Sequence, residues 1–150
     1  MNYFAITKDD MLNGEGLRVV LWVAGCSHHC CGCHNAYTWN KDDGLPFTEE
    51  TKQEIFTELN KKHIQGVTLS GGDPLFIANR KAITELLEEI AWKYPEKDIW
   101  LYTGYEYEEI KHLPVMNYIN VLIDGKFIPE LADVNYPWMG STNQKLRRLK

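Results

Sequence analysis

Val19-Val20-Leu21-Trp22-Val23-Ala24 is an unbroken apolar run that leads directly into Gly25-Cys26-Ser27-His28-His29-Cys30-Cys31-Gly32-Cys33-His34-Asn35. Continuous hydrophobicity over a short segment is typical of a strand buried on both faces, as in a parallel sheet. The second stretch holds all 4 cysteines of the 150-residue chain. Because ligands of α/β sheets bind beyond the carboxyl ends of the strands, the sequence predicts a ligand-binding loop there.

The cysteines of this loop are spaced as ligands rather than as disulfide partners. Three of them have C-x3-C-x2-C spacing: Cys26, Cys30 and Cys33. Three thiolates can hold a [4Fe–4S] cluster and leave one iron free to bind something else. Zinc is the alternative, since a histidine of the loop can complete a four-ligand set: His28, His29 or His34. A vicinal Cys30–Cys31 disulfide would be strained.

Composition and charge describe an ordinary globular protein. With 44% apolar and 25% charged residues, we expect residues 1–150 to form a single domain. The net charge of −5 gives no reason to expect a nucleic-acid partner. No apolar run reaches the roughly 18 residues of a membrane span, and residues 1–10 lack the layout of a signal peptide. We therefore expect a cytoplasmic protein without membrane partners, in which clustered cysteines indicate metal binding or catalysis.

Strand and helix patterns alternate along the chain. We expect strands over residues 3–7, 17–24, 67–69, 99–102 and 118–123. The expected helices run from an N-cap at Thr48 to Gly66, from an N-cap at Asn79 to Pro95, and over residues 106–112. This order predicts an α/β fold with mainly parallel strands, specifically an incomplete, TIM-like βα barrel that is too short to close. Residues 128–150 are expected to be irregular and to lie over the sheet, ending in a solvated basic tail.

A second motif, Ser70-Gly71-Gly72-Asp73-Pro74, follows the expected strand 67–69. It can be a plain turn, in which the glycines supply positive φ angles. It can also let a ligand approach bare main chain, with Asp73 accepting a hydrogen bond from an ammonium group. The position favours the second interpretation, because the motif lies at the same end of the sheet as the cysteines, one βα unit later.

The three spaced cysteines followed by a Gly-Gly-acid loop resemble the radical S-adenosylmethionine (SAM) superfamily. The resemblance implies a [4Fe–4S] cluster on Cys26, Cys30 and Cys33, whose free iron binds the amino and carboxylate groups of SAM. It implies reductive cleavage of SAM to a 5′-deoxyadenosyl radical, with no catalytic residue beyond cluster and cofactor. The implied SAM contacts are Gly32, Cys33 and His34 near the adenine, and Gly71, Gly72 and Asp73 at the methionine end. Two residues at a strand end are further candidates for this site: Tyr102 and Thr103.

Other motifs narrow the resemblance to one family of that superfamily. They extend from Asn13-Gly14-x-Gly16, through Thr38-Trp39 and Tyr102-Thr103-Gly104-Tyr105, to Gly140-Ser141-x-Asn143-Gln144. In this order they are similar to the activating proteins of anaerobic (class III) ribonucleoside-triphosphate reductases, over nearly the whole chain. This implies a glycyl radical made on a C-terminal glycine loop of the large reductase subunit, with a flavodoxin- or thioredoxin-type reductant.

The chain departs from that family at a few positions, and two other functions stay open. His34 stands where Tyr is usual and Glu15 where Pro is common, while Cys31 matches no ligand of the family. One alternative is an activase of another glycyl-radical enzyme, such as pyruvate formate-lyase, although those chains are usually longer. The other is a non-catalytic zinc-binding interaction module. An incomplete barrel favours an enzyme whose substrate is a protein backbone, because its open side admits a loop of another protein.

Overall fold

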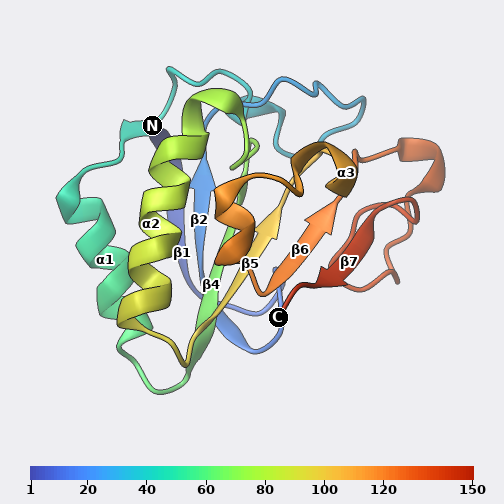
Figure 1. The fold of residues 1–150 in the computed structure, drawn as a ribbon. Coiled ribbons are helices and arrows are strands. Elements are labelled where there is room, and N and C mark those ends of the chain that lie inside the picture. Colours follow the sequence, from blue (N-terminus) through green and yellow to red (C-terminus); the bar gives the residue numbers. More distant parts are fainter.

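The computed structural model describes all 150 residues, which form one seven-stranded sheet with helices packed on one face (Figure 1). The strands are β1 (Asn2–Asp10), β2 (Leu17–Val23), β3 (Leu45–Pro46), β4 (Ile64–Gly71), β5 (Asp98–Tyr102), β6 (Val121–Asp124) and β7 (Lys145–Arg148). The helices are α1 (Glu49–Leu59), α2 (Arg80–Lys93) and α3 (Tyr107–Ile110), with 3-10 turns η1 (Ala36–Thr38), η2 (Ile77–Asn79), η3 (Pro114–Asn117) and η4 (Pro129–Leu131). None of the helices is both long and apolar enough to cross a membrane.

The sheet has the order β3-β1-β2-β4-β5-β6-β7 and does not close. Its four central strands, β2, β4, β5 and β6, are parallel, so their carboxyl ends lie along one edge. The flanking strands β1, β3 and β7 are antiparallel to their neighbours. The α/β class and the parallel centre of the sheet are confirmed. Strand β1 is covered on its outer side by the two-residue β3.

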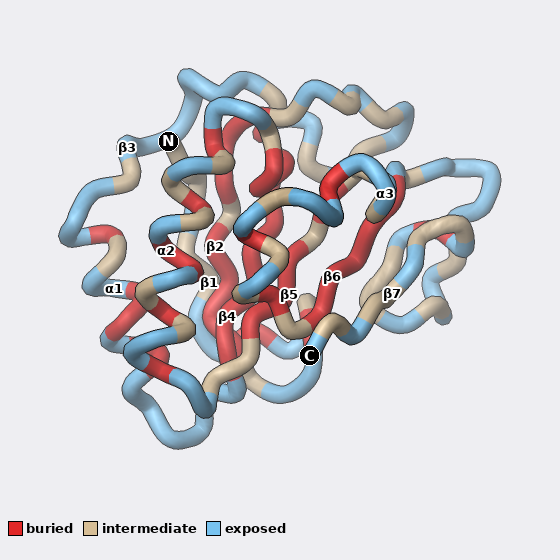
Figure 2. Tube along the Cα trace, in the orientation of Figure 1, coloured by how far each residue is buried: buried red, intermediate tan, exposed pale blue.

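The core lies between the sheet and the helices, as the alternation of side chains along the strands dictates. Strand residues of one face join helix residues in a cluster of 21 buried side chains, which includes Val19, Leu21, Leu69 and Leu101. The opposite face carries a smaller cluster formed by Trp100, Val121 and Ile123, against which the C-terminal segment packs through Trp138. Figure 2 shows the central strands buried along their length. A rigid core of this kind holds the strand ends in place.

Helices α1 and α2 start at the expected residues, but only α1 has a side-chain cap. Thr48 caps α1 and forms a capping box with Thr51. The helix ends at Leu59 rather than at Gly66, which lies inside β4. There a Cβ atom would lie 2.0 Å from the main-chain oxygen of Asp98 on β5, so the glycine serves packing and does not stop a helix. Asn79 precedes α2, yet its side chain makes no capping bond.

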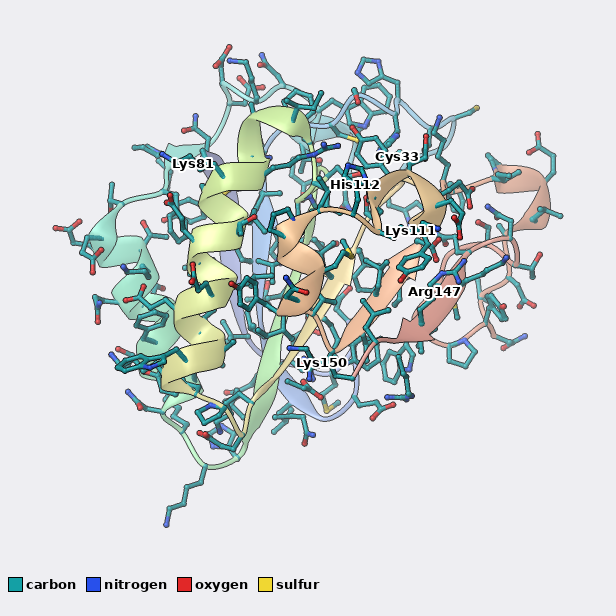
Figure 3. The ribbon with its side chains drawn as sticks, in the orientation of Figure 1. Cys33, Lys81, Lys111, His112, Arg147 and Lys150 are labelled. Carbon is teal, nitrogen blue, oxygen red and sulfur yellow. The ribbon has the colours of Figure 1, made fainter.

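The expectation of an irregular tail over residues 128–150 is wrong for its last part. Residues 145–148 form β7, which pairs antiparallel with β6. Arg147 Nε donates to a carboxylate oxygen of the buried Asp124 at 2.9 Å. Figure 3 shows Arg147 on this strand. The sequence did not predict β7, because its charged residues lack a strand pattern and its partner strand, β6, lies about twenty residues away.

Candidate functional site

The carboxyl ends of the parallel strands and the loops after them surround one pocket, at the end of the sheet toward which the arrows of β2, β5 and β6 point in Figure 1. Its lining residues come from segments far apart in the sequence: Cys26, His28, Cys30, Cys33, Asn35, Trp39, Ser70, Gly71, Gly72, Asp73, Tyr102, Thr103, Gly104, Gly125, Phe127 and Gln144. This is the arrangement expected for ligands of a parallel sheet.

Three of the four cysteines line this pocket, and they are the three with ligand spacing: Cys26, Cys30 and Cys33. All three are partly buried, whereas Cys31 is exposed and is not part of the lining. Cys33 is labelled in Figure 3. All four thiols are free of disulfides. Geometry therefore separates Cys31 from the other three in the way that spacing predicts.

The predicted SAM contacts divide into two groups. Six of them line the pocket: Cys33, Gly71, Gly72, Asp73, Tyr102 and Thr103. Gly32 and His34 are exposed and lie outside the lining. The His34 ring instead packs at a tilt on Phe127, with 5.6 Å between centroids. The structure thus brings the methionine-side candidates to the cysteines and leaves two of the three adenine-side candidates at the surface.

Main-chain hydrogen bonds join the start of the cysteine loop to the residues that follow it. Gly25 N donates to Thr38 O at 2.7 Å, and Cys26 N donates to Trp39 O at 3.0 Å. Within the loop, Cys33 N donates to Cys30 O at 3.2 Å. The amide of Asn35 is directed at the Cys33 sulfur, 3.4 Å away. Donors of this kind stabilise thiolates that bind metal.

The loop after β4 packs directly against the loop after β2. Asp73 N donates to Gly25 O at 2.7 Å, and Gly72 N donates to Val23 O at 2.8 Å. A Cβ on Gly72 would lie 2.5 Å from Gly25 O, so only glycine permits this approach. Gly71 has a φ of 106°, a conformation that favours glycine. The Gly-Gly pair is therefore required by the contact between the two loops.

Asp73 is buried, and several donors surround its carboxylate. Its Oδ1 accepts from Leu75 N, and its Oδ2 accepts from Gly104 N, both at 2.9 Å. The Thr103 hydroxyl lies 2.9 Å from both oxygens. His28 Nε2 lies 2.5 Å from Oδ2. Sequence reasoning placed an ammonium group on this carboxylate, whereas the structure surrounds it with donors of the protein itself.

His28 connects the cysteine loop to the ends of β4 and β5. Its ring meets the Tyr105 ring edge-on at 4.6 Å, in addition to the contact with Asp73. A Cβ on Gly104 would lie 2.5 Å from the His28 ring, so this glycine makes room for the imidazole. Because an ionised carboxylate can only accept, the Nε2 atom of His28 is the donor. No sequence signal pairs His28 with Asp73, since the two residues are 45 positions apart.

Burial governs the ionisation of two lining residues. It raises the pKa of the Cys26 thiol to about 11, and the main-chain N–H groups of His28 and His29 oppose only part of that rise. Cys26 is therefore protonated at neutral pH in the metal-free chain, and a bound metal has to displace the proton. Burial also raises the pKa of Tyr102, whose hydroxyl donates to Trp138 O at 2.8 Å. Tyr102 thus anchors the C-terminal segment as well as lining the pocket.

The donor set fits an iron–sulfur cluster. Cys26, Cys30 and Cys33 line one pocket. A cluster binds each thiolate at a different iron, so its cysteines surround a pocket. The Trp39 indole N–H supports the fit, because it belongs to a pocket-lining residue and is buried without a hydrogen-bond partner. A bound group can supply the missing acceptor.

An open α/β sheet with three cysteines and a Gly-Gly-Asp loop around one pocket at its strand ends defines a metallocluster-binding protein. Residues 12–147 match the family described as a 4Fe-4S single cluster domain. An anaerobic ribonucleoside-triphosphate reductase-activating protein of Enterobacteria phage T4 is 49% identical over 146 residues, which cover 97% of this chain and 93% of the relative. The chain therefore belongs to the family of anaerobic ribonucleoside-triphosphate reductase-activating proteins.

Further relatives of the same name extend this finding to bacteria. The protein of Escherichia coli (strain K12) is 43% identical over 154 residues, covering 100% of both chains. That of Haemophilus influenzae is 42% identical over 154 residues, covering 100% of this chain and 99% of the relative. The resemblance inferred from motifs is thus confirmed, and the family match supports an iron–sulfur cluster in the cysteine loop.

Several lining residues were not predicted as site residues, although most lie within motifs that the sequence shows. Asn35, Trp39, Gly104 and Gln144 belong to such motifs, and Phe127 lies outside those named above. Gln144 accepts from Gly140 N and Ser141 N and donates to Gly125 O, so it shapes the wall beside Phe127. Membership of a motif was the available signal for these residues. Only the fold shows which of them face the pocket.

Proposed function

We propose that this protein activates an anaerobic ribonucleoside-triphosphate reductase by generating a glycyl radical on its large subunit. Cys26, Cys30 and Cys33 would hold a [4Fe–4S] cluster through three thiolates, leaving one iron for SAM. Bound there, cluster and cofactor would supply reductive cleavage of the SAM sulfonium and a 5′-deoxyadenosyl radical that takes a hydrogen atom from glycine. The protein would thus be a radical SAM enzyme whose substrate is a polypeptide.

One observation carries this proposal: the three spaced cysteines and the Gly71–Asp73 loop line the same pocket, although 37 residues lie between Cys33 and Gly71. A cluster with a free iron needs a second ligand-binding element beside it, and the Gly71–Asp73 loop is in that place. The names of the relatives support the identity of the reductase. Residues 71–73, 102 and 103 would receive SAM, with Cys33 at the boundary between cluster and cofactor.

The chain's own residues would bind and orient the cofactors and exclude water from the site. Asp73, with Thr103 and Gly104, holds the ends of β4 and β5 together at the pocket wall. Gly25 and Gly72 keep the cysteine loop against that wall. Trp39 and Phe127 contribute apolar surface to the lining. In this proposal the chain's own groups position two cofactors, and no side chain has to transfer a proton.

The architecture fits a large partner. We infer that the open sheet is an incomplete βα barrel, formed by residues 1–150 as one domain, whose missing strands leave the pocket accessible. Ile77 and Ile128, on the loops after β4 and β6, are exposed apolar side chains. Ile128 lines a hollow together with His28 and Cys30, beside the main pocket. A C-terminal glycine loop of the reductase could approach here, in a cytoplasmic complex served by a flavodoxin- or thioredoxin-type reductant.

The test is an anaerobic preparation of the full chain analysed for iron and sulfide. It is then given dithionite and SAM, and we expect 5′-deoxyadenosine as the product. Addition of the reductase large subunit should yield an organic radical signal in electron paramagnetic resonance (EPR), located on glycine by isotopic substitution. Stoichiometric zinc without nucleoside product would overturn the enzymatic function. A radical on pyruvate formate-lyase but none on the reductase would reassign the partner.

A further inference from the structure

His28 is the feature that neither the cluster ligands nor the predicted SAM contacts explain. It lies midway between Cys26 and Cys30, two residues from each, so its position is tied to both thiols. Its side chain is only 7% exposed, and that of its partner Asp73 is 2% exposed. A contact this deeply buried differs from the ion pairs that exposed, flexible side chains form at the surface.

Several residues are arranged around the His28 ring. Gly104 leaves the space that the ring fills, and Tyr105 packs edge-on against it. Arg80 packs on Tyr105 in turn, with its guanidinium 5.3 Å from the Tyr105 ring centre. Arg80 Nε also donates to Leu75 O, within the turn that follows Asp73. The imidazole is thus held on two sides, and its Nε2–H is directed at the Asp73 carboxylate.

Asp73 belongs to the loop that, in the proposed function, receives the methionine end of SAM. Its main-chain N–H is bound to Gly25 O, immediately before Cys26. The cysteine loop therefore contacts Asp73 twice, once through the main chain at Gly25 and once through the side chain of His28. Two contacts separated along the loop constrain its orientation relative to Asp73 as well as its distance from it.

We propose that His28 is a positioning residue that, by donating to Asp73, fixes the cysteine loop against the Gly71–Asp73 loop and so aligns the cluster with the SAM site. This rests on the proposed function, since it assumes that SAM binds beside the three cysteines. His28 is not a metal ligand in this proposal and need not contact SAM. Its removal leaves the three thiolates in place but lets the loop that carries them shift relative to the SAM site.

The experiment compares SAM binding by cluster-loaded variants. His28→Phe keeps a ring against Tyr105 and loses the donor, while His28→Gln retains an N–H at a similar reach. His63→Phe is the matched control, because His63 Nε2 also contacts a carboxylate, that of Asp9 at 2.9 Å, but on the exposed surface. For each, iron and sulfide content, the SAM dissociation constant, and the change in the EPR spectrum of the reduced cluster on adding SAM are measured.

We expect His28→Phe to retain iron and sulfide and to bind SAM on the order of tenfold more weakly, the effect of losing one charge-assisted hydrogen bond. Its EPR spectrum should change incompletely on adding SAM, and His28→Gln should recover most of both losses. His63→Phe should match the unsubstituted protein. Unchanged SAM binding by His28→Phe, no recovery in His28→Gln, or loss of the cluster from both would overturn the proposal. Absence of SAM binding by the unsubstituted protein would instead contradict the proposed function, and with it this inference.

Discussion

Asp73 is a buried carboxylate that joins segments distant in sequence. A buried charge is tolerated in a protein only when hydrogen bonds replace the water it has lost. Here the replacement comes from Leu75 N, Thr103 Oγ1, Gly104 N and His28 Nε2, which belong to three different loops. The same residue is therefore structurally required at a position that the motif assigns to ligand binding.

Thr103→Val tests the strength of this arrangement. The substitution keeps the shape of the side chain, removes a donor from Asp73 and leaves Tyr105 N without its acceptor. We expect the free energy of unfolding of the cluster-free protein to fall by about 1–3 kcal/mol, measured by urea denaturation under anaerobic, reducing conditions. Thr57→Val is the control, because its hydroxyl is exposed and bonded only within α1, and it should change stability by less than about 0.5 kcal/mol. Equal losses would show that the Asp73 carboxylate does not depend on Thr103.

The four cysteines provide a second prediction for single residues. Cys26→Ala, Cys30→Ala and Cys33→Ala should each abolish cluster loading, since every one removes a thiolate from the pocket. Cys31→Ala should retain most of the iron and sulfide, because Cys31 is exposed and outside the lining. Iron and sulfide per chain after anaerobic reconstitution, with the absorbance of the cluster, provide the measurement. A Cys31→Ala protein without iron would show that the ligand assignment is wrong.

Among the elements, the junction between β2 and α2 depends on a side chain that resembles a helix cap. Asn79 stands directly before α2 but has helical backbone angles and makes no capping bond. Its Nδ2 donates instead to Ala24 O at 2.8 Å, at the end of β2, in a fully buried position. The residue thus ties the start of the helix to the strand that leads into the cysteine loop.

Asn79→Asp distinguishes this hydrogen bond to Ala24 O from a helix cap. Aspartate is a good N-cap, but its carboxylate has no N–H to donate to Ala24 O. We expect Asn79→Asp to lower the free energy of unfolding by about 1–3 kcal/mol, and by at least as much as Asn79→Ala does. Thr48→Ala, which removes the true cap of α1, should cost about 1 kcal/mol. Unchanged stability of Asn79→Asp in urea denaturation would indicate that Asn79 does act as a cap.

For the whole molecule, the C-terminal strand completes the sheet on the side of β6. Strand β7 covers an edge that would otherwise expose unpaired main-chain groups of β6. The buried Asp124 accepts from Arg147 Nε and from Tyr107 N, so one carboxylate joins β7, β6 and α3. Beyond this strand the chain returns to β6 through Leu149 N, which donates to Asn120 O. The pocket wall formed by residues 125–144 is thus held at both ends.

Two adjacent arginines test this closure. Arg147→Ala leaves the buried Asp124 carboxylate with one donor fewer, and we expect roughly 1–3 kcal/mol less stability, since the partly exposed arginine is screened by water. Arg148→Ala removes an exposed ion pair with Glu15 and should cost at most about 1 kcal/mol. Urea denaturation of both variants provides the comparison. Similar effects of the two would show that Asp124 is satisfied without β7.

The central strands, the two main helices and the three cysteines that line the pocket could be predicted because their signals are local. An apolar run such as residues 19–24 is buried wherever it lies in a fold, and C-x3-C-x2-C spacing brings three thiols together within one loop. Other features could not be predicted, including the end of α1, the role of Asn79 and strand β7. In each of these, a residue is held by a partner remote in sequence, and local propensity yields to that contact.

By itself the sequence determined the α/β class, the three cysteines, the Gly-Gly-Asp loop and the family, because each of these lies in residues that are adjacent or regularly spaced. Only the tertiary structure decided that the Asp73 carboxylate is surrounded by donors of the protein, that His28 supplies one of them, and that the sheet ends in a paired β7. The physical reason is burial. A carboxylate or a strand edge removed from water has to find partners, and the fold determines which residues come within reach.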